Sequence, residues 1–146
     1  MSRPYVFISY AGQDEFEAEL LKFALETLLE DIGVGAWIFQ QDQNRAERDI
    51  AESLKERVKS SRAMIFLVSP ATLERGATQW MELAYADAFE VPTFVLLHRL
   101  QYEDLRTSSR GVPPLLLAGQ CNAAMDWRMV VKAIRVRIRE GVTDGD

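Results

Sequence analysis

The chain has 146 residues, of which 48% are hydrophobic and 27% charged, and its formal net charge is −5. This length and balance predict one ordinary globular domain and argue against a disordered, fibrous or two-domain protein. The acidic charge gives no basic surface for nucleic acid or for an anionic membrane, so we expect neither as a partner.

The composition also limits where the protein works and which groups it uses. We find no secretion signal and no membrane-spanning stretch, and Cys121 is the only cysteine, so we expect a cytoplasmic protein without disulfides. His98 is the only histidine and by itself cannot form a His-based metal site or a Ser/His relay. We therefore interpret it as a polar residue at a strand end, and expect no metal and no cofactor. The predicted domain covers residues 1–140, followed by a flexible tail, 141–146.

The first part of the chain alternates strand and helix signals. Residues 5–9, YVFIS, predict a buried strand. Asp14 and Glu17 then indicate a helix start, and the helix ends before Gly33. Its apolar side chains at helical spacing are Phe16, Leu20, Phe23, Ala24 and Leu28. Residues 34–39 repeat the strand signal, and a polar loop follows over residues 40–48.

The alternation continues to the end of the chain. Asp49 and Glu52 indicate a second helix, with Ile50, Leu54 and Val58 on its buried face. Residues 63–69 form a continuous apolar run, typical of a strand that is covered on both faces. Ser69 then caps a short helix that ends at Gly76, and Thr78 caps the helix after it. Further along, we expect a strand at 92–98, irregular structure at 100–114, a fifth strand near 121–125, and a final helix over 127–139 with Ile134 and Ile138 buried.

This order predicts an α/β fold, a doubly wound five-stranded parallel sheet in the flavodoxin-like order 2-1-3-4-5 with helices on both faces. Such sheets bind ligands in the crevice at the carboxyl ends of strands one and three. In this chain the rim of the crevice comprises the residues after strand one, the 40–48 loop, Ser69 and the turn that carries Glu82. The candidate substrate-binding residues are Ser9, Tyr10, Ala11, Phe39, Asp42, Arg48, Ser69 and Trp80.

Glu82 lies in the mostly apolar stretch TQWMELAYADA, residues 78–88. A structural explanation is that a glutamate in a first helical turn is favoured by the positive end of the helix dipole. A functional explanation is that a charged residue beside a ligand crevice serves the site. The residues alone leave both explanations open.

Several common occupants of such sheets are excluded by their motifs. A response-regulator receiver requires an aspartate at the end of strand three, where this chain has Ser69, and a flavin-binding domain requires a phosphate-binding loop where this chain has SYAGQD. The chain also contains no GxxxxGK[ST] and no GxGxxG sequence, so it lacks the usual nucleotide phosphate sites.

Three motifs in order, FISYAGQD at 7–14, FLVSP at 66–70 and ELAYA at 82–86, resemble those of Toll/interleukin-1 receptor (TIR) domains, and the resemblance covers nearly the whole chain. In particular the chain resembles the bacterial NAD+-cleaving type. In that type the catalytic residue is the glutamate of a Trp-x-x-x-Glu pattern, and the resemblance implies that Glu82 is this residue here. Two positions depart from the pattern. Trp80 stands two residues before Glu82 instead of four, and the loop after strand two has Ala46 and Glu47 where a Pro-Gly turn is usual.

The resemblance implies an NAD+ nucleosidase that breaks the nicotinamide–ribose bond and needs no cofactor besides its substrate. The products would be nicotinamide and either ADP-ribose or a cyclic ADP-ribose isomer, and the setting would be bacterial antiphage immunity. It also implies self-association through TIR–TIR contacts and control by a sensor or effector partner, if this chain is a domain excised from a longer one. The alternative is a non-enzymatic TIR adaptor or virulence mimic that acts by TIR–TIR association.

Overall fold

The computed structural model describes residues 3–38, 47–75, 77–107, 116 and 121–145. Its five strands form one parallel sheet in the order β2-β1-β3-β4-β5, as predicted. The strands are β1 (Tyr5–Ser9), β2 (Gly35–Ile38), β3 (Ala63–Val68), β4 (Thr93–Leu97) and β5 (Cys121–Ala123).

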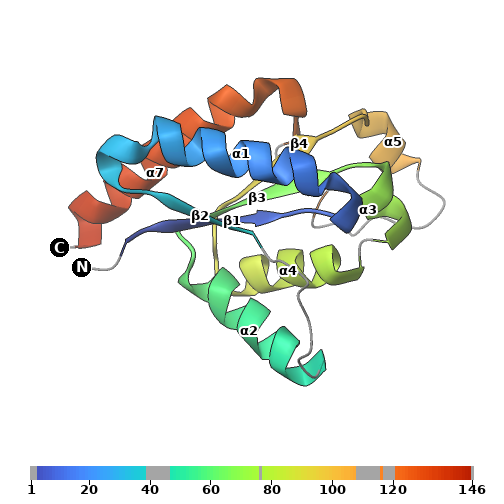
Figure 1. The fold of residues 1–146 in the computed structure, drawn as a ribbon, viewed down its shortest axis with the longest axis horizontal. Helices are drawn as coiled ribbons and strands as arrows, with labels where there is room; N and C mark the ends of the chain where they lie inside the picture. The colour runs from blue at the N-terminus through green and yellow to red at the C-terminus, as the bar shows by residue number, and fades with distance from the viewer. Residues whose placement is uncertain (1–2, 39–46, 76, 108–115, 117–120, 146) are drawn as a thin grey trace.

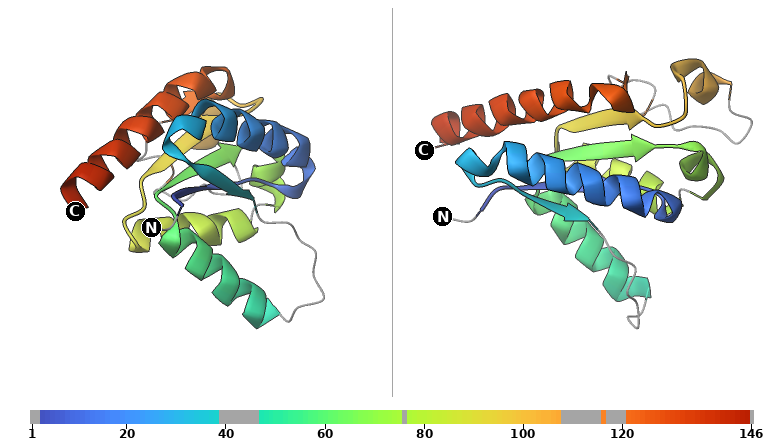
Figure 2. Two further views of the ribbon diagram at one scale, coloured as in Figure 1. Left: turned by 60° about the vertical axis from the view of Figure 1, so that its left-hand side comes forward. Right: turned by 45° about the horizontal axis from the view of Figure 1, so that its top comes forward.

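Helices cover both faces of this sheet and make three layers (Figures 1 and 2). One face carries α1 (Glu15–Leu28) and α7 (Trp127–Gly145), and the other carries α2 (Glu47–Ser60) and α4 (Ala77–Ala88). Shorter helices are α3 (Pro70–Arg75), α5 (Tyr102–Arg106) and three 3₁₀ turns, η1 (Gly12–Asp14), η2 (Glu30–Ile32) and η3 (Ala124–Asp126). Among the described residues, no helix combines the length and the apolar character that crossing a membrane requires.

Alternate residues of each strand point to opposite faces, which divides the core into two clusters. Ile8 packs beneath α1 and α7 with Ile65, whereas Phe7 packs beneath α2 and α4 with Phe66. All six residues of β3 are buried, as its continuous apolar sequence predicted. The central strand pair, β1 and β3, is therefore held from both sides.

The apolar residues whose spacing indicated the first helix do not form its buried face. Its buried residues are Ala18, Leu21 and Leu25, whereas the predicted apolar residues Phe16, Leu20, Phe23 and Leu28 are 46–72% exposed. The buried set and the exposed set each recur at helical spacing. This is possible because α1 has apolar residues around most of its circumference. Only the packing against the sheet selects which stripe is buried.

Other boundaries differ in smaller ways. The helix α2 begins at Glu47, two residues before the predicted Asp49, and Leu54 and Val58 are buried as expected. The segment predicted to be irregular contains α5, whose start is fixed by a capping box between Gln101 and Asp104. The last helix extends to Gly145 and so includes most of the residues that the sequence assigned to a tail. Ile134 and Ile138 are buried as predicted.

The two faces of α1 can be separated by a matched pair of substitutions. Leu25→Ala, at a fully buried position, should lower the free energy of unfolding by about 2–5 kcal/mol, because it leaves a cavity. Leu20→Ala, at a position that is 54% exposed, should lower it by at most about 1 kcal/mol. Urea denaturation of both variants measures the difference, and equal losses would contradict the assigned orientation of α1.

Candidate active site

The strand order places the carboxyl ends of β1 and β3 side by side, and two serines mark these ends. Ser9 is the last residue of β1, and Ser69 directly follows β3. Each is 1% exposed, and each hydroxyl group donates a hydrogen bond to a buried carboxylate. Ser9 binds Glu82 of α4, and Ser69 binds Asp14 of η1.

Glu82 lies deep in the protein, only 3% exposed, and accepts a hydrogen bond of 2.6 Å from the Ser9 hydroxyl to its Oε1. Among the residues whose side chains are described, no lysine or arginine forms an ion pair with it. Burial raises the pKa of Glu82 from its ordinary value of 4.5 to about 8, although the Ser9 hydrogen bond acts to lower it. At neutral pH the Glu82 side chain is therefore mainly protonated.

The structure removes the helix-dipole explanation for this glutamate. The helix α4 begins at Ala77, so Glu82 lies in its second turn, and the first turn contains no acidic residue. The effect of the dipole falls off within the first turn. The expectation that Thr78 caps this helix is also wrong, because Thr78 lies inside it.

Tyr10 is half-buried and lies close enough to Glu82 for that charge to influence it. Burial is the main cause that raises the pKa of the Tyr10 phenol to about 12, and the carboxylates of Glu15, Glu19 and Glu82 add to the shift. Tyr10 therefore stays a neutral phenol throughout the physiological pH range. Ala11, the next residue, is buried at the start of η1.

Ser69 and Asp14 tie the loop after β1 to the loop after β3. The Ser69 hydroxyl donates to Asp14 Oδ2 and also accepts the backbone N–H of Ala71, which is the predicted cap of the short helix α3. Asp14 stands at the N-cap position of α1, as the predicted helix start requires, but its side chain makes no capping hydrogen bond there. Its carboxylate instead accepts the hydrogen bond from Ser69.

Trp80 packs against the core beneath α4, where its ring stacks on Phe66 with 5.8 Å between ring centroids. Phe39 and Asp42 lie outside the described residues, and so does the side chain of Arg48. Of the predicted substrate-binding residues, the structure thus brings Ser9 into direct contact with Glu82 and places Tyr10 nearby. Ser69 lies at the same edge of the sheet but contacts Asp14.

Gln79 is a site residue that the sequence did not indicate. It lies one helical turn before Glu82, is 2% exposed, and donates from Nε2 to the Leu67 carbonyl at 2.9 Å. Its Oε1 is buried and accepts no hydrogen bond within the part of the chain that the structure describes. A buried amide oxygen without a partner costs about 1–3 kcal/mol, so Gln79 offers an open acceptor on the Glu82 side of α4.

Comparison with known proteins places the chain among characterised folds. The family model described as "TIR domain" matches residues 6–126. No curated protein sequence matches the chain. A structure described as a 2-desoxiribosyltransferase from Leishmania mexicana superposes with a TM-score of 0.57 at 15% identity, covering 82% of this chain and 89% of that one.

A second similar structure is that of the TIR domains of the activated Roq1 resistosome, which directly recognises the pathogen effector XopQ. It superposes with a TM-score of 0.54 at 17% identity and covers 96% of this chain and 77% of that one. At such low identity both structures establish the shared fold and nothing finer.

The buried carboxyl group of Glu82 should lower the stability of the folded protein when it is charged. An uncharged side chain at this position should therefore stabilise the protein. The folded-state pKa of Glu82 is raised, so its contribution is most favourable below pH 4.5 and is lost as the pH rises through about 8. Glu82→Gln should therefore raise the melting temperature at pH 8.5, and by less at pH 5. Calorimetry across this range measures the difference, with Asp87→Asn, at an exposed carboxylate of α4, as the control. A Glu82→Gln effect that does not change with pH would contradict the raised pKa.

Proposed function

The chain belongs to the TIR domain family, and we propose that it is an NAD+ nucleosidase in which Glu82 is the catalytic residue. The observation that carries this proposal is the buried carboxyl group at the ligand edge of the sheet, in contact with Ser9 and with no cation beside it in the described part of the chain. Such a group costs stability, and titratable groups with strongly shifted pKa values gather at functional sites.

Cleavage of NAD+ at the nicotinamide–ribose bond needs little from the protein. Nicotinamide leaves as a neutral molecule, so no general acid has to protonate it. Positive charge develops on the ribose as in an oxocarbenium ion, and a fixed carboxylate stabilises that charge. The two electrons of the breaking C–N bond leave with nicotinamide, and water or an adenine nitrogen of the same molecule then attacks the ribose carbon.

The shifted pKa of Glu82 fits this chemistry. A pKa of about 8 means that the Glu82 carboxyl group is mainly neutral at pH 7. A cationic substrate close to the carboxyl group favours its charged form and so promotes loss of the proton. The negative charge on Glu82 then lies beside the positive charge that develops on the ribose in the transition state. The site contains little water, which strengthens the attraction between the two charges.

The other candidate residues have supporting roles in this proposal. Ser9 holds the orientation of the carboxylate through its 2.6 Å hydrogen bond. Tyr10, a neutral phenol, and Gln79, an open acceptor, offer polar contacts to the ribose hydroxyls or the carboxamide of nicotinamide.

We place the activity in a bacterial, cytoplasmic setting, as part of defence against phage. Self-association through TIR–TIR contacts would complete the site, and a sensor or effector partner would control it. The product is ADP-ribose if water reaches the ribosyl cation first, and a cyclic isomer if adenine does.

A second candidate function, that of a non-enzymatic TIR adaptor, is favoured by the outer surface of α1. Phe16, Leu20 and Phe23 lie at helical spacing and are 54–72% exposed. Exposed apolar side chains grouped on one face mark surfaces for protein contacts. An adaptor would use this surface and would retain Glu82 only as a structural residue.

The two candidate functions predict different effects of Glu82→Gln on the cleavage of NAD+. Concentrated protein incubated with NAD+ should release nicotinamide, and Glu82→Gln should lower the rate at least about 100-fold, the scale of losing an electrostatic stabiliser in a transition state. Chromatography with mass detection measures nicotinamide and identifies the second product. The control Asp87→Asn should keep the wild-type rate. If the wild-type protein releases no nicotinamide even when concentrated, the adaptor candidate is favoured.

Ser9→Ala should shift the dependence of the reaction on pH. The Ser9 hydrogen bond lowers the pKa of Glu82, so its loss moves that pKa further above 8 and leaves less carboxylate at neutral pH. For the wild-type protein, kcat/KM should rise with pH through about 8. For Ser9→Ala the rise should occur at higher pH, so that the variant is impaired more at pH 7 than at pH 9. An equal loss at all pH values would indicate that Ser9 acts by shape alone.

A further inference from the structure

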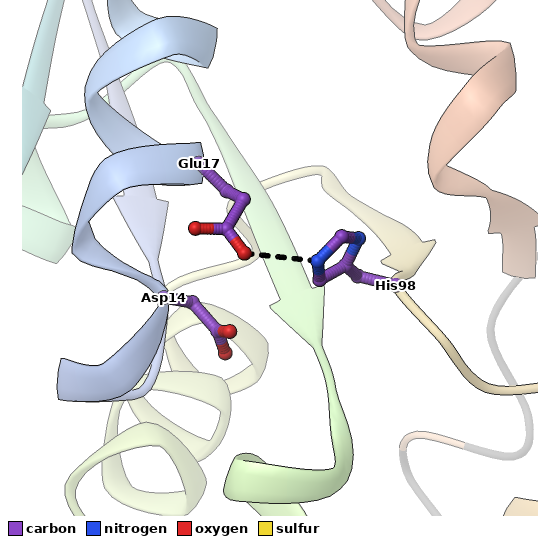
Figure 3. Close-up of side chains that lie close together, drawn as sticks. All are labelled: Asp14, Glu17 and His98. Carbon is purple, nitrogen blue, oxygen red and sulfur yellow. Dashed lines mark hydrogen bonds and ion pairs between the residues drawn. The ribbon is translucent and has the colours of Figure 1, made fainter.

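A second group of polar side chains lies on the α1 side of the sheet, outside the Glu82 site. Asp14 of η1, Glu17 of α1 and His98, directly after β4, each offer one potential ligand atom, and these atoms lie within 4.8 Å of one another. Figure 3 shows the Glu17 carboxylate directed at the His98 ring, with Asp14 below them. Glu17 Oε2 and His98 Nε2 are 2.9 Å apart.

We propose that Asp14, Glu17 and His98 bind a divalent transition metal ion, with Zn²⁺ as the best match. One imidazole nitrogen with two carboxylate oxygens is a donor set for zinc and its neighbours, whereas Mg²⁺ and Ca²⁺ prefer oxygen alone. Metal–ligand bonds of about 2.0–2.2 Å in a tetrahedral site separate the donor atoms by roughly 3.4 Å. The three atoms lie within 4.8 Å of one another, so the widest pair needs to close by at most about 1.4 Å around an ion. The Glu17 Oε2 and His98 Nε2 atoms, 2.9 Å apart, need to open by about 0.5 Å.

The surroundings of Asp14 are typical of a metal-binding side chain that is fixed in position. Asp14 is 7% exposed, and the Ser69 hydroxyl donates to its Oδ2. Carboxylates that bind metals are typically fixed by such a second contact. A carboxylate has about four lone-pair sites, so the Ser69 hydrogen bond leaves room for an ion.

The charges of the cluster also favour a cation. Two carboxylates face a single imidazole, and the only ion pair that either makes with a described residue is the one between Glu17 and His98. With a neutral imidazole, the form that binds metal, the cluster carries two negative charges, which a divalent ion would neutralise.

An adjoining cavity gives an ion access to the cluster and leaves a coordination position open. A cavity of about 420 Å³ is lined by Glu17 and His98 and otherwise largely by apolar residues of α1, β3, β4 and α7, among them Leu21, Leu67 and Trp127. Its apolar walls reduce screening by water around the two polar groups. A fourth ligand, water or a donor atom of a small molecule in the cavity, would complete the site.

The site is separate from the chemistry proposed for Glu82. Leu21 and Leu67, beside the cavity, belong to the core beneath α1 and α7, whereas Leu83, next to Glu82, belongs to the core beneath α2 and α4. From the sequence we expected no metal, because His98 has no second histidine. The fold brings the carboxylates of Asp14 and Glu17 close to His98.

Zinc binding can be measured on the intact chain without any assay of activity. The protein, freed of any histidine tag, carries Cys121→Ser, which removes its only thiol. Titration with Zn²⁺ alone is followed by calorimetry and by the ¹⁵N and ¹H resonances of the imidazole ring, which are unambiguous because His98 is the only histidine. We expect one zinc ion per chain, with the ring signals shifting in step with the heat of binding.

Single substitutions then assign the ligands. His98→Asn and Glu17→Gln should each weaken zinc binding at least about 10-fold, the scale on which even supporting residues act. Glu19→Gln, at an exposed carboxylate of the same helix, should leave the affinity unchanged, and circular dichroism confirms that each variant is folded. An affinity that is the same in His98→Asn and the parent protein, or ring signals that do not move at saturating zinc, would overturn the proposal. Neither outcome depends on whether the protein cleaves NAD+.

Discussion

The structure depends on how buried carboxylates are satisfied at the carboxyl edge of the central strands. An isolated charge in an apolar interior is costly, so a buried carboxyl group must find a hydrogen-bond donor or remain protonated. Here the donors are the serines at the ends of β1 and β3, which bind Glu82 and Asp14. These two contacts join α4 and η1 to the centre of the sheet and bring the polar groups of both proposed sites to one edge.

The two contacts have different consequences because their surroundings differ. Glu82 has only Ser9 among its described polar partners, and burial raises its pKa to about 8. Asp14 lies near Glu17 and His98, where a cation could be shared. The protein thus uses one device, a serine at a strand end, to hold one carboxylate that can change its charge and another that can bind an ion.

The proposed NAD+ chemistry and the proposed metal site occupy opposite faces of the sheet. Their connection runs through Ser69, which contacts Asp14 and caps α3, the helix directly before α4. An ion at Asp14 would therefore restrain the segment that leads to the helix of Glu82.

The sequence alone determined the fold class and the strand order, because apolar runs of strand length alternate with helical periodicity throughout the chain. It also singled out Glu82, an acidic residue in an apolar stretch beside the predicted crevice. It could not decide which side of α1 faces the sheet, because Leu25 and Phe23 belong to stripes of similar apolar character. Only packing distinguishes them, and the outcome leaves Phe16 and Phe23 exposed.

The tertiary structure alone decided the partners of the polar residues. Local sequence assigned Asp14 to a helix start and Glu82 to a first helical turn, and both assignments follow rules that consider only near neighbours along the chain. The actual partners, Ser69 for Asp14 and Ser9 for Glu82, are 55 and 73 residues distant. His98 meets Glu17 across 81 residues. Such contacts depend on strand order and burial together, so the sequence could indicate which strand ends these residues lie near but not which partners hold their charges.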